Sequence, residues 1–479
     1  MDIESMIPTQ ATLSLQSFFT RPADDQLALL DNEQPLSYTE VVNKSLTLAS
    51  TIARSEEQYW GLYCEDTGHF IISLLALLAA GKTICLPANN QPGTLADLAN
   101  HAAILLTDSH GDGFTGHCYQ LPQLNTIVKD ESFEPRTARA SLIFFTSGSS
   151  GNPKAVHKQL WQLENEIQAQ EQKWGETLEN PVILACVAHQ HIYGILFRIL
   201  WPLLARRTID THQHQYPESL LAAIAQHDKV AVIASPAQLE RLPKELNWSV
   251  CKHRVTAVFS SGAPLQARFA AEAQRCFSVL PLEILGSTES GGVAWRQQHC
   301  EPASLNAWQP LPGVHVQLDD NGLLTVFSPW LDNPEDCCVM GDRAEIIADH
   351  GFLLKGRADQ IVKIEGKRVS LTEISQRLSD HYLVERTALT VLEMARQQLG
   401  AIVVLTDEGK AILNKQGRLA IPRLLKKTLS QYFEAVTLPR KWRFVEIMPV
   451  NAQGKLVHSE LARLFTTGLP SEATDEDNG

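Results

Sequence analysis

The feature that most constrains what this chain can fold into is a short loop rich in hydroxyl groups and glycine, residues 146–151. The loop reads TSGSSG, follows the apolar run Ser141–Phe145, and is followed shortly by a lysine. Glycines let backbone N–H groups turn toward an anion, hydroxyls add further donors, and lysine adds a positive charge. We therefore predict a phosphate-binding loop after a buried strand. Its binding residues are expected to be Thr146, Ser147, Gly148, Ser149, Ser150, Gly151 and Lys154.

Two other interpretations of the loop are weaker. Serine and glycine runs are typical of flexible linkers, but the strand-like run before the loop and Pro153 after it argue against a linker. A Walker P-loop requires Gly-Lys followed by Ser or Thr. Here Lys154 follows Pro153 and precedes Ala155, so the Walker pattern fails.

The loop resembles the phosphate-binding loop of the adenylate-forming superfamily, which includes acyl-CoA synthetases, coumarate-CoA ligase-like enzymes, luciferases and the adenylation domains of peptide synthetases. Other segments match the motifs of this family in the same order along the chain. They are Leu285–Glu289 (LGSTE), Met340–Asp342 (MGD), Gly356–Lys363 (GRADQIVK), and Pro449 with Gly454 and Lys455. The stretch Gln190–Gly194 (QHIYG) resembles, less specifically, a segment of the acyl- and aryl-activating members.

The resemblance implies an α/β fold with two parts. A large N-terminal domain of α/β sheet subdomains, residues 1–357, would hold ATP and the acyl pocket. A small mobile α+β domain, residues 358–466, would follow a hinge at Asp359, and the acidic residues 467–479 are expected to be disordered. The length of 479 residues also exceeds the usual limit of a single core.

Runs of strand-like sequence support the α/β assignment without the resemblance. Each of four runs leads into a turn or a helix, which favours a sheet with ligand groups at the strand ends. The runs are Val182–Val187, Val230–Ala234, Val255–Phe259 and Leu282–Leu285. In the last third of the chain, Leu399–Leu405 and Arg443–Ile447 predict strands of a separate core.

Three residues carry the adenylation chemistry that the resemblance implies. Lys455 is the expected catalytic cation, reaching the carboxylate and phosphate oxygens. Glu289 is the expected Mg²⁺ ligand, because a hard cation between phosphate oxygens prefers carboxylate. Thr288 would donate to the α-phosphate. From the residues alone, Thr288 and Glu289 could instead cap a helix N-terminus, and Lys455 could be an ordinary turn residue.

The resemblance also assigns residues to the nucleotide. Asp342 would accept hydrogen bonds from the ribose hydroxyls, and Arg357 would contact the ribose or the phosphates, although an isolated Gly-Asp is usually a turn. The remaining ATP-binding residues are expected to be Gly262, Ala263, Leu285, Gly286 and Ser287. Alternatively, the segment 260–265 is a plain strand-turn-helix junction with Pro264 in the first helical turn.

A third set of residues is assigned to the acid and the thiol. His191 would orient or gate the substrate carboxylate, although a histidine between apolar segments is often only structural. Gly366 would border a tunnel through which a pantetheine thiol arrives after the small domain rotates. The acyl pocket is expected to include Tyr193, Gly194 and Ser261.

Departures from the family pattern leave a catalytically silent nucleotide-binding homologue as an alternative. Leu285 stands where an aromatic residue usually stacks on adenine, which would weaken ATP binding. Met340 replaces a threonine, and His458 replaces an arginine. None of these changes removes a charge that the chemistry requires, so an active enzyme is the expectation.

The expected reaction is AMP-forming ligation of a fatty or aryl acid to a thiol, with ATP and Mg²⁺. An amino acid substrate is disfavoured because the His191 segment lacks the aspartate that binds an α-ammonium group. The acceptor is coenzyme A or, alternatively, the phosphopantetheine of an acyl carrier protein. A basic concentration could dock an acidic carrier, but it could equally be a solvated helix face. It comprises Lys415, Arg418, Arg423, Lys426, Lys427, Arg440, Lys441 and Arg443.

Composition excludes other classes of partner. The net charge of −13 argues against nucleic acid or an anionic membrane as the main partner. Phe70–Ala80 is apolar but too short to span a bilayer, so we predict a buried helix. No secretory signal precedes it. Nine cysteines without a CxxC pair indicate reduced thiols, and a cytoplasmic enzyme is expected, with its oligomeric state left open.

Overall fold

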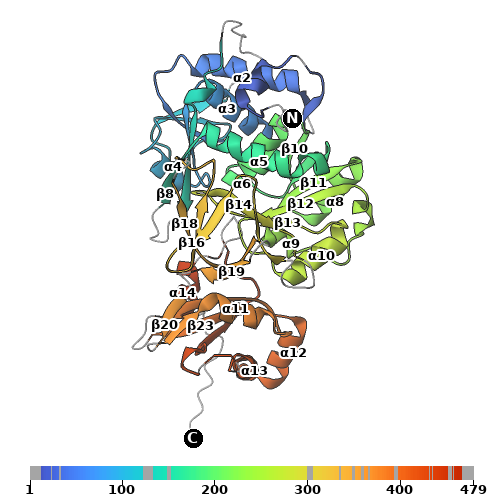
Figure 1. Ribbon diagram of the computed structural model, residues 1–479, viewed down its shortest axis with the longest axis vertical. Coiled ribbons are helices and arrows are strands. Elements are labelled where there is room, and N and C mark those ends of the chain that lie inside the picture. The colour runs from blue at the N-terminus through green and yellow to red at the C-terminus, as the bar shows by residue number, and fades with distance from the viewer. Residues whose placement is uncertain are drawn as a thin grey trace, which may run out of the picture. The chain divides into compact units, whose positions relative to one another are not determined.

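The protein is described here by a computed structural model, which covers most of the chain (Figure 1). The described residues are 12–22, 24–31, 34–121, 133–147, 153–298, 306–333, 336–347, 351–357, 361–364, 367–392, 397–430, 432–433, 435–450, 456 and 458–466. The predicted disordered tail, residues 467–479, lies outside these ranges.

The chain divides into two compact units. The first consists of Met1–Gln317, Thr325–Cys338 and Ile347–Gly351. The second consists of Leu318–Leu324, Val339–Ile346 and Phe352–Gly479. The boundary expected after residue 357 stays a prediction.

A six-stranded sheet in the first unit carries the predicted phosphate-binding loop. Its order is β6-β5-β3-β4-β7-β8, and all neighbours are parallel except the last pair. The strands are β3 (Tyr59–Tyr63), β4 (Thr83–Leu86), β5 (Ile104–Thr107), β6 (His117–Gln120), β7 (Ser141–Ser147) and β8 (Pro153–Gln159). Strands β7 and β8 pair in antiparallel register up to Ser147 opposite Pro153, and residues 148–152 between them lie outside the described residues. The predicted strand over Ser141–Phe145 is confirmed.

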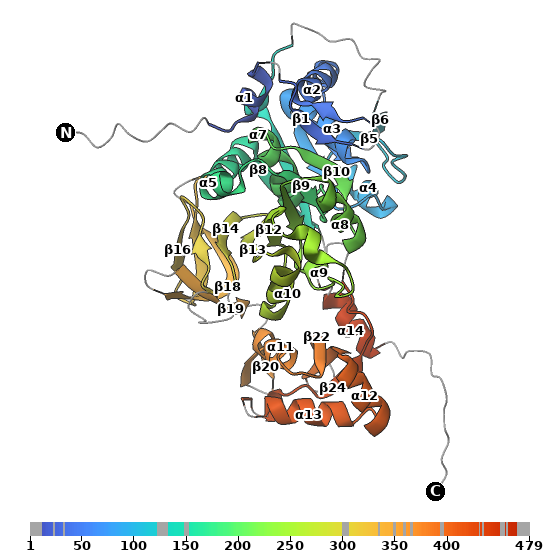
Figure 2. The same cartoon turned by 90° about the vertical axis from the view of Figure 1, so that its right-hand side faces the viewer.

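A nine-stranded sheet forms the other large layer of the first unit (Figure 2). Its order is β15-β14-β13-β12-β11-β9-β10-β1-β2. The strands are β1 (Leu27–Leu30), β2 (Leu36–Ser37), β9 (Val182–Ala185), β10 (Ile209–Gln213), β11 (Val230–Ala234), β12 (Val255–Ser261), β13 (Leu282–Ser287), β14 (Gly291–Arg296) and β15 (Gln309–Pro310). The run from β13 to β1 is parallel, so all four strands predicted from the sequence are confirmed within one parallel sheet.

Helices of the first unit cover these sheets. They are α1 (Leu15–Thr20), α2 (Tyr38–Ile52), α3 (Thr67–Ala79), α4 (Pro92–Leu98), η2 (Thr137–Arg139), α5 (Leu160–Leu178), α6 (Ile192–Gly194), η3 (Ile195–Leu200), α7 (Trp201–Leu204), α8 (Pro217–Gln226), α9 (Pro236–Leu239), η4 (Trp248–Cys251) and α10 (Ala267–Phe277). The α3 helix is buried from Phe70 to Ala79, which confirms the predicted buried helix. Within the described residues, no helix is long and apolar enough to cross a bilayer.

The longest of these helices, α5, continues directly from strand β8. Gln159 and Gln162 close a reciprocal capping box at its start. Its buried apolar positions include Leu163, Ile167 and Trp174, which recur at helical spacing and face the core. The direct connection fixes the direction of α5 relative to the phosphate-loop hairpin, because no flexible linker separates them.

A four-stranded sheet of order β16-β17-β18-β19 contributes residues to both units. Its strands are β16 (His315–Leu318), β17 (Leu323–Phe327), β18 (Cys338–Ile347) and β19 (Gly351–Arg357). The second unit also contains β20 (Ile361–Ile364), β21 (Lys367–Ser370), β22 (Val384–Leu392), β23 (Gln398–Leu405) and β24 (Lys441–Phe444). Its helices are α11 (Leu371–Ser379), α12 (Asp407–Gln416), α13 (Ala420–Leu429), η7 (Ala435–Thr437) and α14 (His458–Thr466).

The second unit has a hydrophobic core of its own. Ile374 of α11, Val403 of β23 and Leu425 of α13 are fully buried in one cluster. The strand predicted over Leu399–Leu405 is confirmed. The strand predicted over Arg443–Ile447 is shifted: β24 ends at Phe444, where its pairing with β23 ends. With α/β sheets in the first unit and this α+β domain, the predicted fold class is confirmed.

Candidate active site

The predicted Mg²⁺ ligand Glu289 lies in the tight turn that joins β13 to β14. Residues 288–290 form the turn, and the two strands pair in antiparallel register. The turn is held by Ser287 and Ser290, whose backbone amides each donate to the hydroxyl oxygen of the other at 3.1 and 3.0 Å. No helix begins at this turn. The alternative that Thr288 and Glu289 cap a helix is therefore wrong, because a hairpin reverses the chain here.

Two glycines make this hairpin possible. Gly291 has a φ of +67°, a region that side chains disfavour, and a Cβ there would lie 2.6 Å from both Glu166 Oε2 and the Trp330 ring. A Cβ on Gly286 would lie 2.5 Å from the carbonyl oxygen of Gly291. The turn therefore packs against its surroundings without room for side chains at these positions.

Lys154 of β8 reaches the same turn from the phosphate-loop hairpin. Its Nζ lies 3.6 Å from Oε1 of Glu289, and the two side chains are 64% and 39% exposed. An exposed ion pair of this kind contributes about 1 kcal/mol or less. A phosphate group or a cation can therefore replace it at little cost, so the predicted loop lysine and the predicted metal ligand meet at an accessible point.

Two buried charged residues that the sequence analysis did not single out contact the same turn from behind. Lys158 of β8 donates from Nζ to the backbone carbonyl oxygen of Glu289 at 2.7 Å. Glu166 of α5 accepts the backbone N–H of Gly292 at 3.0 Å. Burial lowers the pKa of Lys158, and burial raises the pKa of Glu166 to about 7. Both side chains are at most 4% exposed.

The end of strand β12 lies beside this hairpin in the sheet. Ser261 donates from its hydroxyl to the carbonyl oxygen of Ile284 at 2.9 Å, which joins β12 to β13. Gly262 follows with a φ of +93° and is exposed, and no described atom lies within 4 Å of a Cβ built there. The segment is a strand-turn-helix junction, as the alternative held, but α10 begins only at Ala267, so the placement of Pro264 in its first turn is wrong.

Other predicted nucleotide-binding residues cluster near this strand end. Ala263 is exposed, and Leu285 is partly exposed on β13 beside the exposed Gly286. Strand pairing sets Leu285 opposite Ala294. Ser287 uses its hydroxyl within the turn, at 3.0 Å from the hydroxyl of Ser290. The contacts of these four residues with ATP therefore stay predictions.

The Gln190–Gly194 segment forms the start of a helix. His191 occupies the N-cap position of α6 in an extended conformation. Gly194 approaches the preceding strand end so closely that a Cβ would lie 2.1 Å from the carbonyl oxygen of Ala188. The ring of Tyr193 packs on Phe197 with centroids 5.0 Å apart. Within the described residues the shielded Tyr193 hydroxyl finds no hydrogen-bond partner, and burial raises its pKa well above the usual value.

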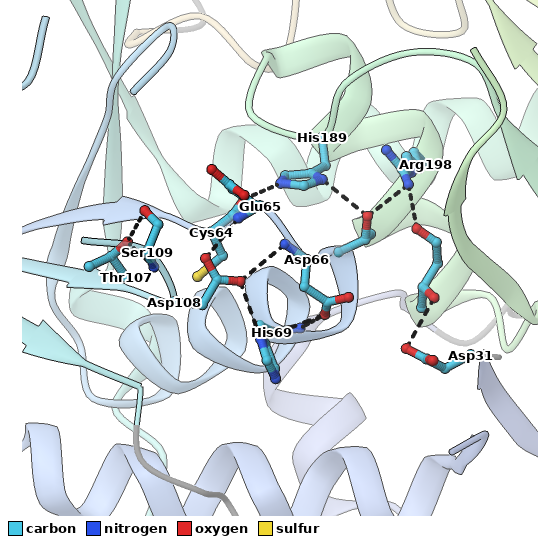
Figure 3. A network of polar contacts seen from close by, with 12 residues as sticks. Asp31, Cys64, Glu65, Asp66, His69, Thr107, Asp108, Ser109, His189 and Arg198 are labelled. Atoms are coloured by element: carbon cyan, nitrogen blue, oxygen red, sulfur yellow. Dashed lines mark hydrogen bonds and ion pairs between the residues drawn. The ribbon is translucent and has the colours of Figure 1, made fainter. Parts of the chain in front are cut away.

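A buried polar network holds the chain immediately before His191 (Figure 3). His189 Nε2 donates to the carbonyl oxygen of Cys64 at 3.0 Å, which leaves Nδ1 to accept the Thr67 hydroxyl at 3.3 Å. Arg198 in turn donates to the Thr67 hydroxyl oxygen at 2.8 Å and to the carbonyl oxygen of Val187 at 2.9 Å. Burial and the nearby Arg198 charge lower the pKa of His189 to about 3, so this ring is neutral.

Asp108 extends the network into the six-stranded sheet. Its carboxylate accepts the backbone N–H groups of Glu65 and Asp66 at 2.9 and 3.0 Å and contacts His69 Nδ1 at 3.2 Å (Figure 3). These contacts fix the start of α3, from which Thr67 meets His189. The network thus ties the segment that carries His191 to the sheet that carries the phosphate loop.

The second unit brings two of the predicted residues together. Asp342 on β18 and Arg357 on β19 lie 3.9 Å apart, from Oδ2 to Nη1. Their side chains are 15% and 49% exposed. A Cβ on Gly341 would lie 2.8 Å from Arg357 Nη2, so a glycine here leaves room for the guanidinium. The two residues, which the sequence analysis assigned to the same ribose, therefore lie close together.

Several predicted site residues lie outside the described residues. For Thr146 and Ser147 the backbone is described as the end of β7, but the side chains are not. The others are Gly148, Ser149, Ser150, Gly151, Asp359, Gly366 and Lys455. Their roles stay predictions.

A family profile described as AMP-binding enzyme matches residues 16–326. The chain belongs to the AMP-binding enzyme family. The resemblance inferred from the motifs is therefore confirmed, and the protein is an ATP-using enzyme of the AMP-forming acid–thiol ligase class.

Curated relatives and solved structures agree with this family. The chain is 27% identical over 331 residues to a 4-coumarate–CoA ligase of Halorhodospira halophila, covering 66% of this chain and 75% of that protein. It is 22% identical over 539 residues to the mitochondrial malonate–CoA ligase of Mus musculus, covering 94% and 90%. The structure of ATP-bound MatB from Rhodopseudomonas palustris superposes with a TM-score of 0.80 at 18% identity, covering 95% and 99%. This solved structure thus shares the fold of the chain.

We predict that His189 makes the first unit less stable in acid. An unfolded histidine binds a proton near pH 6.5, while the buried ring stays neutral until about pH 3, so the stability it contributes is present above pH 6.5 and is lost as the pH falls toward 3. Between about pH 7.5 and pH 5 the loss is about 2 kcal/mol. Urea unfolding of the wild type and of His189→Gln at both pH values should show a difference in unfolding free energy that changes by this amount. The exposed His117→Gln is the control, and an unchanged difference for His189→Gln would contradict the prediction.

Proposed function

We propose that the protein activates a fatty or aryl carboxylic acid with ATP as an acyl-adenylate and transfers the acyl group to the thiol of coenzyme A. The observation that carries this proposal is the meeting of Lys154 and Glu289, from the phosphate-loop hairpin and the β13–β14 turn, at 3.6 Å. One cation and one carboxylate, both accessible, are what a polyphosphate with its counter-ion requires. The two curated relatives reported above are named as coenzyme A ligases of different acids.

In the first step an oxygen of the substrate carboxylate attacks the α-phosphorus, and pyrophosphate leaves. Both reactants are negatively charged, so the site must neutralise charge as the new bond forms. Lys154 binds phosphate oxygens, Thr288 donates to the α-phosphate, and the loop residues 146–151 supply further donors. Lys455, carried by the small domain, stabilises the developing charge, an effect commonly worth a few kcal/mol.

The residues present fit a Mg²⁺ ion that is held jointly by the protein and the nucleotide. Within the described ranges, no group of three or more histidine, cysteine or carboxylate side chains is placed to hold a metal alone. Mg²⁺ commonly binds to one or two carboxylates together with substrate phosphates, and the partly exposed Glu289 supplies one. When bound, the ion would neutralise phosphate charge and orient the leaving pyrophosphate.

Separate sets of residues would bind the ribose and the base. The Asp342 carboxylate accepts the ribose hydroxyls, and Arg357, within 3.9 Å of it, contacts the ribose or the phosphates. The base lies against Gly262, Ala263 and the strand Leu285–Ser287. The exposed, unobstructed position of Gly262 supports this assignment, because a ligand can approach its backbone closely.

The acid would lie near the start of α6. His191 orients its carboxylate, and Tyr193, Gly194 and Ser261 line the acyl pocket. The packing of Tyr193 on Phe197 supports an apolar acyl group, whether aryl or fatty. In the second step the small domain rotates about Asp359, and the thiol arrives past Gly366, attacks the acyl carbon and displaces AMP.

We predict that pyrophosphate exchange into ATP requires an acid of the right class. Labelled pyrophosphate should enter ATP because formation of the acyl-adenylate is reversible. Among fatty, cinnamic and benzoic acids, only one class should support this exchange. Lys455→Ala should lower the exchange by 10²-fold or more through loss of the transition-state cation, while circular dichroism and thermal melting stay unchanged. Binding of ATP without exchange on any acid would instead favour the catalytically silent homologue suggested by Leu285 and Met340.

A carrier-protein acceptor is the second candidate, because the second unit exposes basic side chains near one another in sequence. The exposed members are Lys415, Arg418, Arg423, Lys427, Arg440 and Lys441. Arg443 has a different role, since its Nε donates to the carbonyl oxygen of Leu464 at 2.9 Å and its guanidinium lies over the Phe465 ring. It is therefore a structural contact of α14.

We predict that charge reversal distinguishes the two acceptors. Arg423→Glu with Lys427→Glu should leave thioester formation with coenzyme A within about twofold of the wild type, because these exposed side chains would contact only a large acidic partner. If a carrier protein is the acceptor, the same variant should lose carrier loading at least tenfold. The measurement is thioester formation with each acceptor, and Glu408→Lys on the neighbouring helix is the control. Equal loss with both acceptors would contradict a docking role.

A further inference from the structure

Lys158 and Glu166 contact the backbone of the β13–β14 turn on either side of Glu289. Lys158 Nζ donates to the carbonyl oxygen of Glu289 at 2.7 Å. Glu166 Oε1 accepts the N–H of Gly292 at 3.0 Å. The two contacts hold one carbonyl and one amide within four consecutive residues, so the turn cannot shift as a body without breaking one of them.

Both side chains are far more buried than their types usually are. Lys158 is 4% exposed and Glu166 is 3% exposed. Removing a charge from water costs several kcal/mol unless it is paired and hydrogen-bonded. The attraction between the Lys158 and Glu166 charges, together with the Asp332 carboxylate, offsets part of this cost at Lys158. Fold stability alone does not explain two buried charges against one short turn, because an apolar pair would pack there without the desolvation cost.

The rigid connection of β8 to α5 makes the two contacts act together. Lys158 is next to last in β8, and Glu166 lies two turns into α5, which starts at Leu160 without a linker. The same β8 strand carries Lys154 at its other end. One continuous strand and helix therefore holds both the lysine predicted to bind phosphate and the contacts that place Glu289.

The neighbourhood of Glu166 is built around this contact. Its Oε1 also accepts from Gln170 Nε2 at 3.3 Å, one helical turn further along α5. One turn earlier, Gln162 donates from Nε2 to the carbonyl oxygen of Trp330 at 2.9 Å. Any side chain at Gly291 would meet Glu166 Oε2 at 2.6 Å. The carboxylate thus occupies the space that Gly291 and Gly292 leave open.

We propose that Lys158 and Glu166 form a buried clamp that positions Glu289 for Mg²⁺-nucleotide binding. The inference rests on the proposed function of Glu289 and extends it to two positioning residues. The clamp acts on the backbone of the turn, which leaves the Glu289 carboxylate free to exchange Lys154 for a metal ion. Neither clamp residue would touch the reactants, because both side chains are buried behind the turn.

The chain offers matched controls for both members. Lys82 is 5% exposed and donates from Nζ to the carbonyl oxygens of Ser55 and Glu57 at 2.7 and 2.8 Å, away from the turn. Glu164 lies on the same helix as Glu166 and accepts the N–H of Leu15 at 2.7 Å. Each control removes a side chain-to-backbone hydrogen bond from another place.

The first test is hydrogen exchange of the segment 285–296 in the full-length protein without nucleotide. Lys158→Met and Glu166→Ala should speed exchange in this segment by about tenfold, since each leaves a backbone group of the turn without its partner. Glu166→Gln, which keeps the acceptor oxygen, should restore most of the protection. Lys82→Met and Glu164→Ala should leave the segment as in the wild type. If neither clamp variant speeds exchange there beyond its control, the clamp is disproved, whether or not the protein adenylates an acid.

The second test is the Mg²⁺ dependence of pyrophosphate exchange at saturating ATP. Both clamp variants should raise the Mg²⁺ concentration for half-maximal pyrophosphate exchange about tenfold, and Glu289→Gln should raise it further, while the controls should leave it unchanged. An unchanged Mg²⁺ dependence, or an equal change in the controls, would overturn the positioning role. If the wild type shows no pyrophosphate exchange, the proposed function is refuted. In that case the hydrogen-exchange test alone shows whether the clamp exists. If a single variant does not fold, Lys158→Met with Glu166→Gln removes both charges together and takes its place.

Discussion

The contact between two hairpins is the constraint on which the rest of the first unit depends. The β7–β8 hairpin carries the predicted phosphate loop, and the β13–β14 hairpin carries Glu289. They come from different sheets, and Lys158 joins them by donating to the Glu289 carbonyl oxygen, 131 residues away in sequence. A buried lysine is costly, so the chain keeps this bond only because nearby carboxylates and a backbone oxygen satisfy the charge. Lys154 of the same strand lies 3.6 Å from the Glu289 carboxylate at this junction.

A second junction places the predicted acid-binding segment. His189 and Arg198 are buried, and Thr67 hydrogen-bonds to both of them at the start of α3. This network joins the chain before His191 to the six-stranded sheet, which also carries the phosphate loop. The segments predicted to bind phosphate and acid are therefore both anchored to this sheet, and the proposed in-line attack of carboxylate on phosphorus would need such fixed positions.

The sequence predicted the strands well, because an apolar run is a local signal. Apolar runs such as Val230–Ala234 are fully buried strands in the structure, and Asp342 and Arg357 do lie together. The clamp was missed because its partners are distant in sequence: Glu166 and Gly292 are 126 residues apart. One signal was available, since Gln162, Glu166 and Gln170 place polar groups at successive turns of an otherwise buried helix face. The helix-cap interpretation of Thr288 and Glu289 failed because the chain reverses at a glycine with positive φ, and this conformation cannot be read from residue type alone.

In the proposed reaction, a carboxylate oxygen of the acid becomes bonded to the α-phosphorus of ATP. The most direct measurement uses an accepted acid labelled with ¹⁸O at both carboxylate oxygens and follows the label by mass spectrometry after thioester formation. Attack on the α-phosphorus followed by thiol displacement breaks the bond between acyl carbon and labelled oxygen, so each AMP should carry one ¹⁸O. Label in inorganic phosphate with ADP as product, or AMP without label, would contradict the adenylate route.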